Sequence, residues 1–90
     1  MAKKRIAVVV RERQSEALRM AVGLTLADDE VNVFLMDNKI EPDENMSLNL
    51  ETLQDLDCKI FTNNPANNYE QMSTEDISKA LVGYDVVIPY

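Results

Sequence analysis

Apolar residues in this chain gather in short runs that are separated by longer amphipathic stretches. Four of these runs contain mostly β-branched residues and predict strands at 5–10, 30–36, 58–62 and 85–89. The first run, RIAVVV, is apolar at nearly every position, which is typical of a strand buried on both faces of a parallel sheet. The pattern therefore predicts a sheet that is covered on both sides.

Three amphipathic stretches between these runs have the period of a helix. In the first, apolar positions recur at i, i+3, i+4 and i+7, namely Leu18, Ala21, Val22 and Thr25. Ser15 is placed to cap the start of this helix. The second helix is predicted over 47–56, and the third follows Ser73, which forms an S-x-x-D capping pattern with Asp76.

The predicted order of elements is β-α-β-α-β-α-β, and it decides the fold class. Strands that are separated by helices cannot pair as hairpins, so they are expected to lie parallel, with right-handed crossovers. We therefore predict a flavodoxin-like α/β fold: three α/β/α layers around a four-stranded, mainly parallel sheet. At 90 residues the chain is expected to form one domain, spanning residues 1–90.

Charge and composition exclude several functions. Nine basic and sixteen acidic side chains give a net charge of −7, which argues against a nucleic-acid partner. No apolar run approaches the roughly 20 residues that span a bilayer, so no membrane association is expected. With one cysteine and no histidine, neither an internal disulfide nor a transition-metal site is expected, and no cofactor is predicted. A cytoplasmic location fits this composition.

The carboxyl ends of the predicted strands are where a ligand would bind in a parallel sheet. Arg11 and Arg13 follow the first strand beside a helix N-terminus, where they could hold a small anion. Asn63 and Asn64 follow the third strand and would complete such a ligand-binding site. The turn after the first strand contains no glycine, so neither a dinucleotide fingerprint nor a P-loop is present.

Cys58 is the only candidate for catalysis, and two readings of it are open. It begins the third predicted strand, on the order of 13 Å from the carboxyl edge. Asp55 and Asp57 are expected to raise its pKa, and no histidine is present to activate it. We therefore predict a mostly buried, slowly reacting cysteine that acts as a small apolar residue, so that no residue is catalytic. The alternative is a sulfur nucleophile.

Three segments carry a family resemblance: SEALRMAVGLTLADDEVNVFLMD, LETLQDLDCKIFTNN and MSTEDISKALVGYDVVIPY. Together they resemble the DsrE/DsrF/TusD-like (DsrEFH) sulfur-relay family. The resemblance implies a flavodoxin-like sheet, assembly into trimers or hexamers, and a persulfide-carrying cysteine just past the third strand. The positions that match this cysteine are Thr62, Asn63 and Asn64, so the family's sulfur-carrying residue has no counterpart here.

Three functions follow as expectations. The first is a non-catalytic DsrE-like oligomeric subunit that binds or scaffolds in intracellular sulfur metabolism, with sulfur-relay proteins as possible partners. The alternatives are a persulfide carrier or sulfurtransferase that uses Cys58, and a small-anion-binding module at the carboxyl edge. A homo-oligomer, as a trimer or hexamer, is also suggested by apolar residues beyond the needs of a four-stranded core, namely Met20, Leu24, Ile40, Met46, Tyr69 and Tyr90.

Overall fold

The computed structural model describes residues 4–26, 30–37, 39–40, 43–67 and 69–90 of the chain. Its elements, in chain order, are β1 (Arg5–Val10), α1 (Gln14–Thr25), β2 (Glu30–Leu35), α2 (Glu44–Asp55), β3 (Ile60–Thr62), β4 (Glu70–Gln71), α3 (Thr74–Leu81) and β5 (Val86–Pro89). None of the helices in the described ranges is long and apolar enough to cross a membrane.

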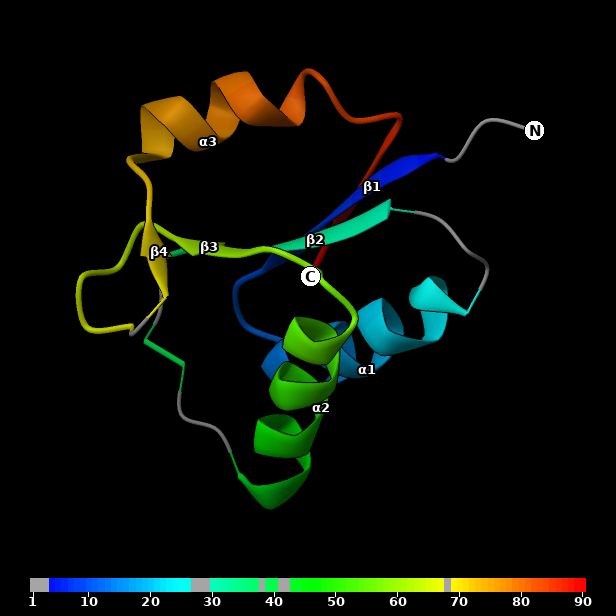
Figure 1. The fold of residues 1–90 in the computed structure, drawn as a ribbon. Helices are drawn as coiled ribbons and strands as arrows, with labels where there is room; N and C mark the ends of the chain where they lie inside the picture. The colour runs from blue at the N-terminus through cyan, green and yellow to red at the C-terminus, as the bar shows by residue number, and fades with distance from the viewer. Residues whose placement is uncertain (1–3, 27–29, 38, 41–42, 68) are drawn as a thin grey trace.

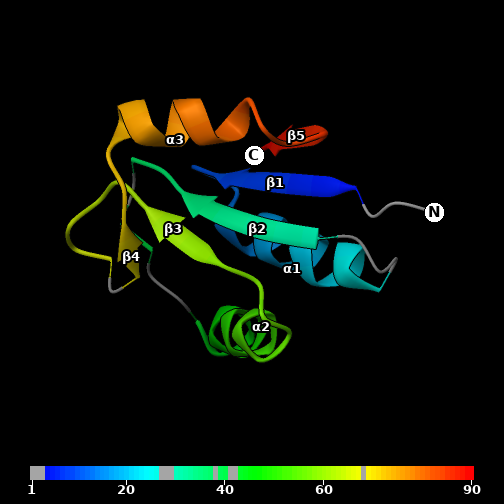
Figure 2. The same ribbon diagram turned by 45° about the horizontal axis from the view of Figure 1, so that its top comes forward.

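The strands form one sheet in the order β4-β3-β2-β1-β5, and every neighbouring pair is parallel. Helices α1 and α2 lie on one face and α3 lies on the other (Figures 1 and 2), which confirms the predicted α/β class and its parallel sheet. The predicted number of four strands is wrong, because the two-residue strand β4 adds a fifth. The strand order also differs from the flavodoxin order 2-1-3-4-5, because β1 here separates β2 from β5.

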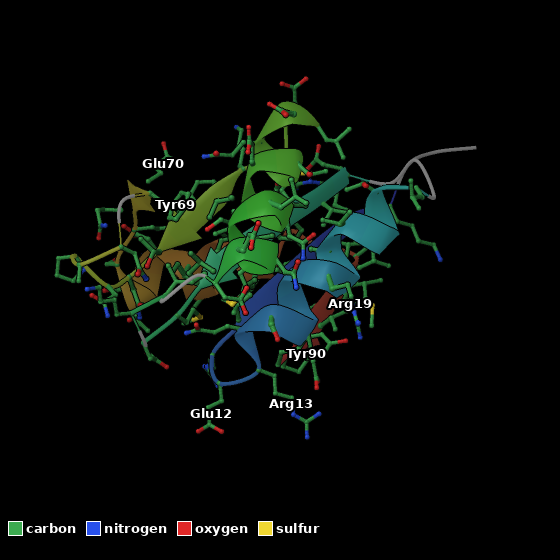
Figure 3. All side chains as sticks on the ribbon, turned by 90° about the horizontal axis from the view of Figure 1, so that it is seen from below. Glu12, Arg13, Arg19, Tyr69, Glu70 and Tyr90 are labelled. Atoms are coloured by element: carbon green, nitrogen blue, oxygen red, sulfur yellow. The ribbon has the colours of Figure 1, made fainter. Side chains whose placement is uncertain are left out.

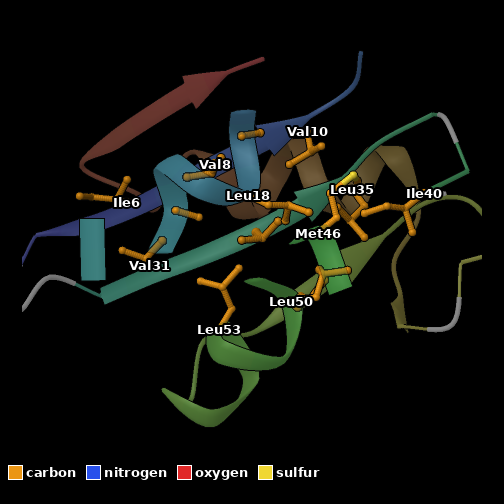
Figure 4. Close-up of a cluster of buried hydrophobic side chains, with 14 residues drawn as sticks. Ile6, Val8, Val10, Leu18, Val31, Leu35, Ile40, Met46, Leu50 and Leu53 are labelled. Carbon is orange, nitrogen blue, oxygen red and sulfur yellow. The ribbon is translucent and has the colours of Figure 1, made fainter. Parts of the chain in front are cut away.

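The core has two parts because successive residues of a strand point to opposite faces of the sheet. Ile6, Val8 and Val10 of β1 face α1 and α2, in a cluster that includes Leu50 and Leu53 of α2 (Figure 4). The intervening residues of β1 belong to a smaller cluster under α3, made of Ala7, Val9, Phe34, Met36, Phe61 and Ile77. One face of the sheet therefore has two covering helices and the other has one.

The start of each helix is fixed by different chemistry. Arg13 occupies the N-cap of α1 without a side-chain cap bond and Ser15 is exposed, so the predicted capping role of Ser15 is wrong. Asp43 caps α2 by accepting a hydrogen bond from the Met46 N–H at 2.8 Å, and this helix begins at Glu44, earlier than predicted. Ser73 caps α3, as predicted, by accepting from the Asp76 N–H at 3.1 Å.

Other expectations also need correction. Strand β3 begins at Ile60, so Cys58 lies two residues before the strand and not within it. Ile40 and Met46, proposed as surplus apolar residues for assembly, are buried in the core beneath α1 and α2, with exposed fractions of 8% and 6%. Both side chains are thus needed within a single subunit.

Candidate functional site

The carboxyl ends of β1 and β5 meet at the point where the direction of the chain across the sheet reverses. From β1 the chain proceeds outward through β2, β3 and β4, and then crosses back through α3 to β5 on the other side of β1. Such a reversal leaves a crevice between neighbouring strand ends, and open α/β sheets bind ligands there. A cavity of about 400 Å³ opens at this point, lined by Arg11, Glu12, Arg13, Asp37 and Tyr90. We call it the β1–β5 crevice.

The backbone at the floor of the crevice is already hydrogen-bonded. Tyr90 donates its N–H to the carbonyl of Val9 at 2.8 Å, and its own carbonyl accepts from the N–H groups of Arg11 and Glu12 at 3.1 and 3.2 Å. These two N–H groups follow β1, the position where many α/β sheets hold a phosphate on free backbone amides. The N–H groups of Arg11 and Glu12 are therefore not free to bind a ligand in this crevice.

Two arginines supply positive charge to the crevice. Arg11 Nε lies 3.5 Å from Asp37 Oδ2, and both side chains are about half exposed. Arg13 Nη1 lies 4.0 Å from Glu16 Oε2, and 72% of the Arg13 side chain is exposed. Ion pairs this open and this long contribute little stability, so the Arg13 guanidinium is only loosely held. Figure 3 shows Glu12 and Arg13 projecting from the start of α1, with Tyr90 nearby.

Asn63 and Asn64 join the same rim through Asp37. The carboxamide of Asn63 accepts from the Asp37 N–H at 2.7 Å and donates to Asp37 Oδ1 at 3.2 Å and to Thr74 Oγ1 at 2.9 Å. Asn64 donates its Nδ2 to the Asp37 carbonyl at 3.1 Å. The structure thus brings Arg11 and both asparagines around one aspartate, with the amides of Asn63 and Asn64 bonded to protein groups.

Asn67 is a rim residue that the sequence analysis did not identify. It is 3% exposed, accepts from the Ile40 N–H at 2.7 Å and donates to Thr62 Oγ1 at 2.9 Å. The only signal in the sequence is the asparagine-rich NNPANN turn, whose composition does not distinguish a buried amide from an exposed one.

Cys58 is separate from the crevice. It precedes β3, at the amino end of the sheet, whereas the crevice lies at the carboxyl end. Its side chain is half-buried and packs against the core beneath α1 and α2. Burial and the nearby Asp57 carboxylate raise the pKa of its thiol. A raised pKa reduces the fraction of thiolate, the form that attacks sulfur and carbon electrophiles.

Of three larger cavities among the described residues, one has no basic side chain and another has an arginine that is already paired. The first, of about 570 Å³ at the start of α3, is lined by Glu70 and Asp76 among other residues, and contains no basic side chain. The second, of about 490 Å³, lies between α3 and the amino half of the sheet. Its Arg5 is occupied by Glu30 at 2.9 Å and by the ring of Tyr84, whose centroid lies 4.6 Å from the guanidinium carbon.

Among the described residues, no group of three or more histidine, cysteine, aspartate or glutamate side chains is placed to hold a metal ion. The chain matches no protein-family model, no curated protein and no solved structure. The fold and the crevice therefore provide the basis for a functional proposal.

Proposed function

We propose that this protein is a non-catalytic binding subunit of the DsrE-like class, and that it binds a small anion in the β1–β5 crevice. The observation that carries the proposal is the gathering of Arg11, Arg13 and Tyr90, together with Glu12 and Asp37, around a cavity of about 400 Å³ at the reversal point of the sheet. The N–H groups of Arg11 and Glu12 are bonded to Tyr90, and the guanidinium groups of Arg11 and Arg13 supply charge-assisted hydrogen bonds to the ligand. We expect weak binding that weakens further with salt, because both arginines are exposed.

The chemistry of Cys58 supports a non-catalytic role. A sulfur carrier needs an accessible thiol that ionises readily, and the Cys58 thiol is half-buried with a raised pKa. The segment just past β3 holds Asn63 and Asn64, whose amides bind the end of β2. These features favour a binding subunit over the alternative of a persulfide carrier that uses Cys58.

The arrangement of elements is the support for the DsrE-like assignment. The parallel sheet, the helices on both faces and the capped last helix agree with the three segments that carry the resemblance. The proposal does not include the flavodoxin strand order, because β5 is an edge strand that pairs with β1. A role in intracellular sulfur metabolism, with sulfur-relay proteins as partners, rests on the resemblance alone.

The test is the effect of sulfate on thermal unfolding of the wild type and of two variants. Arg13→Gln removes a positive charge from the crevice, and Lys79→Gln removes one from α3, where Lys79 is 73% exposed. A ligand that binds only the folded state raises its stability with concentration. Sulfate also stabilises proteins by exclusion from their surface, so the readout is the difference between variants.

We expect sulfate, compared with chloride at equal ionic strength, to stabilise the wild type and Lys79→Gln equally and Arg13→Gln less. Equal stabilisation of all three proteins contradicts the proposal. The rival sulfur-carrier function has its own readout: a persulfide retained on Cys58 after incubation with a sulfur donor, detected by mass spectrometry, would support it instead.

A further inference from the structure

The β1–β5 crevice contains as many acidic as basic side chains. Arg11 and Arg13 contribute two positive charges, Glu12 and Asp37 contribute two negative charges, and Tyr90 completes the lining. The formal charge of the lining is therefore zero. A simple anion that enters the crevice meets two carboxylates as well as two guanidinium groups, and each carboxylate disfavours a like charge nearby. The balance of charge thus narrows the class of anion that fits the crevice.

One acid and one base of the crevice contact each other. Arg11 Nε lies 3.5 Å from Asp37 Oδ2, and Asp37 Oδ1 accepts a hydrogen bond from Asn63 Nδ2 at 3.2 Å. Both carboxylate oxygens of Asp37 are therefore in contact with other side chains. Because Arg11 and Asp37 compensate each other's charge, Glu12 and Arg13 are the charged pair that a ligand can reach.

The side chains of Glu12 and Arg13 are held loosely by the rest of the protein. Arg13 is 72% exposed, and 4.0 Å separates its Nη1 from Glu16 Oε2. Among the described residues no ion pair involves Glu12, and its side chain is exposed. Figure 3 shows both side chains projecting from the start of α1 to the same side of the molecule. A group that binds cations and a group that binds anions thus lie next to each other at the crevice.

We propose that the ligand of the β1–β5 crevice is a small zwitterion of the amino-acid type, whose acidic group binds Arg13 and whose ammonium group binds Glu12. The inference rests on the proposed function, because it names the class of anion that the same crevice binds. A zwitterion leaves the charge of the lining unchanged, whereas sulfate adds negative charge to a chain whose net charge is already −7. The cavity of about 400 Å³ lies within the roughly 300–1,000 Å³ of small-ligand sites.

Three probes that differ only in their charged groups test the inference. L-Alanine has both an ammonium group and a carboxylate, propionate lacks the ammonium group, and ethylammonium lacks the carboxylate. Each probe is titrated into isotope-labelled protein at neutral pH and constant ionic strength, and the amide chemical shifts of residues 11–14 and of Tyr90 give its dissociation constant. Sulfate is titrated in the same way, because it tests the anion site by itself.

We expect alanine to bind roughly two- to fivefold more tightly than propionate, which is the gain from one exposed ion pair, and more tightly than ethylammonium. Glu12→Gln is expected to weaken the binding of alanine and to strengthen that of propionate, because the Glu12 carboxylate attracts an ammonium group and repels an anion. Glu51→Gln, at an exposed position of α2, removes an equal charge outside the crevice and is expected to keep the preference for alanine. The amide spectra also verify that both variants are folded.

The zwitterion and the anion site can fail separately in this experiment. Saturable shifts with sulfate, together with alanine that binds no more tightly than propionate or ethylammonium, overturn the zwitterion and leave the anion site in place. A Glu12→Gln variant in which alanine and propionate change in the same direction has the same meaning. If neither sulfate nor alanine shifts these amides, both proposals are wrong.

Discussion

Asp37 and Asn63 bind each other in both directions, and this pair fixes the carboxyl ends of β2 and β3. The Asp37 N–H donates to Asn63 Oδ1 at 2.7 Å, and Asn63 Nδ2 donates to Asp37 Oδ1 at 3.2 Å. Asp37 has a φ of 69°, a left-handed conformation that aspartate adopts more readily than most residues. The same aspartate pairs with Arg11, so the position of an arginine in the β1–β5 crevice depends on the loop after β3.

Asn63→Ala is expected to destabilise the fold by about 1–2 kcal/mol, because it removes hydrogen bonds to Asp37 and Thr74 from a half-buried amide. Asn45→Ala, at an exposed position of α2, is the control and is expected to have little effect. Denaturant unfolding measures both. Equal midpoints for the two variants would show that the Asp37–Asn63 pair contributes nothing to stability.

Two serines offer a matched test of helix capping. Ser73→Ala removes the oxygen that accepts from the Asp76 N–H, and we expect it to cost about 1 kcal/mol. Ser15→Ala lies inside α1, where the side chain caps nothing, so alanine is expected to be neutral or slightly stabilising. The free energies of unfolding in urea distinguish them, and the reverse ranking would place the start of α1 at Ser15.

Cys58 is expected to react slowly with iodoacetamide at neutral pH, and its rate is expected to rise with pH to a midpoint above the ordinary range of a cysteine. The direction follows from burial and Asp57, which raise the pKa and keep the thiol protonated. Asp57→Asn removes the negative charge, so the pKa of the Cys58 thiol is expected to fall and its alkylation at neutral pH to become faster.

Asp55→Asn is the control for this measurement, because it removes an equal charge at the last residue of α2. We expect it to change the alkylation rate less than Asp57→Asn does. Mass spectrometry measures the alkylation rate across pH. A midpoint of this rate below the ordinary range of a cysteine in the wild type would reverse our account of Cys58 and favour a reactive thiol.

The strands β1 and β2 were predictable because their burial on both faces leaves a continuous apolar signal. Strand β4 was not, because two exposed polar residues have no periodic pattern. The start of α2 was placed too late because Asp43, its cap, lies in a polar run that has the composition of a loop. The carboxylate that caps a helix is indistinguishable by composition from one that faces water.

The candidate site was predictable only in part. Arg11 and Arg13 could be assigned to the carboxyl edge because they directly follow an evident strand. Their grouping with Tyr90 required the strand order, since β5 could have joined the sheet at either side. The two asparagines were placed on the correct edge. The hydrogen bonds of their amides to Asp37 and other protein groups were not predictable, because they depend on the backbone geometry at Asp37, which sequence patterns do not reveal.

The most direct test of the proposed function is a sulfate titration of isotope-labelled protein, followed by amide chemical shifts at constant ionic strength. We expect saturable shifts at residues 11–14 and at Tyr90, and their loss in Arg13→Gln. The start of α3 is an internal reference, because its first turn has Glu75 and Asp76, which repel anions. Shifts that are confined to the β1–β5 crevice support the account; equal shifts at both helix starts, or shifts that persist in Arg13→Gln, contradict it.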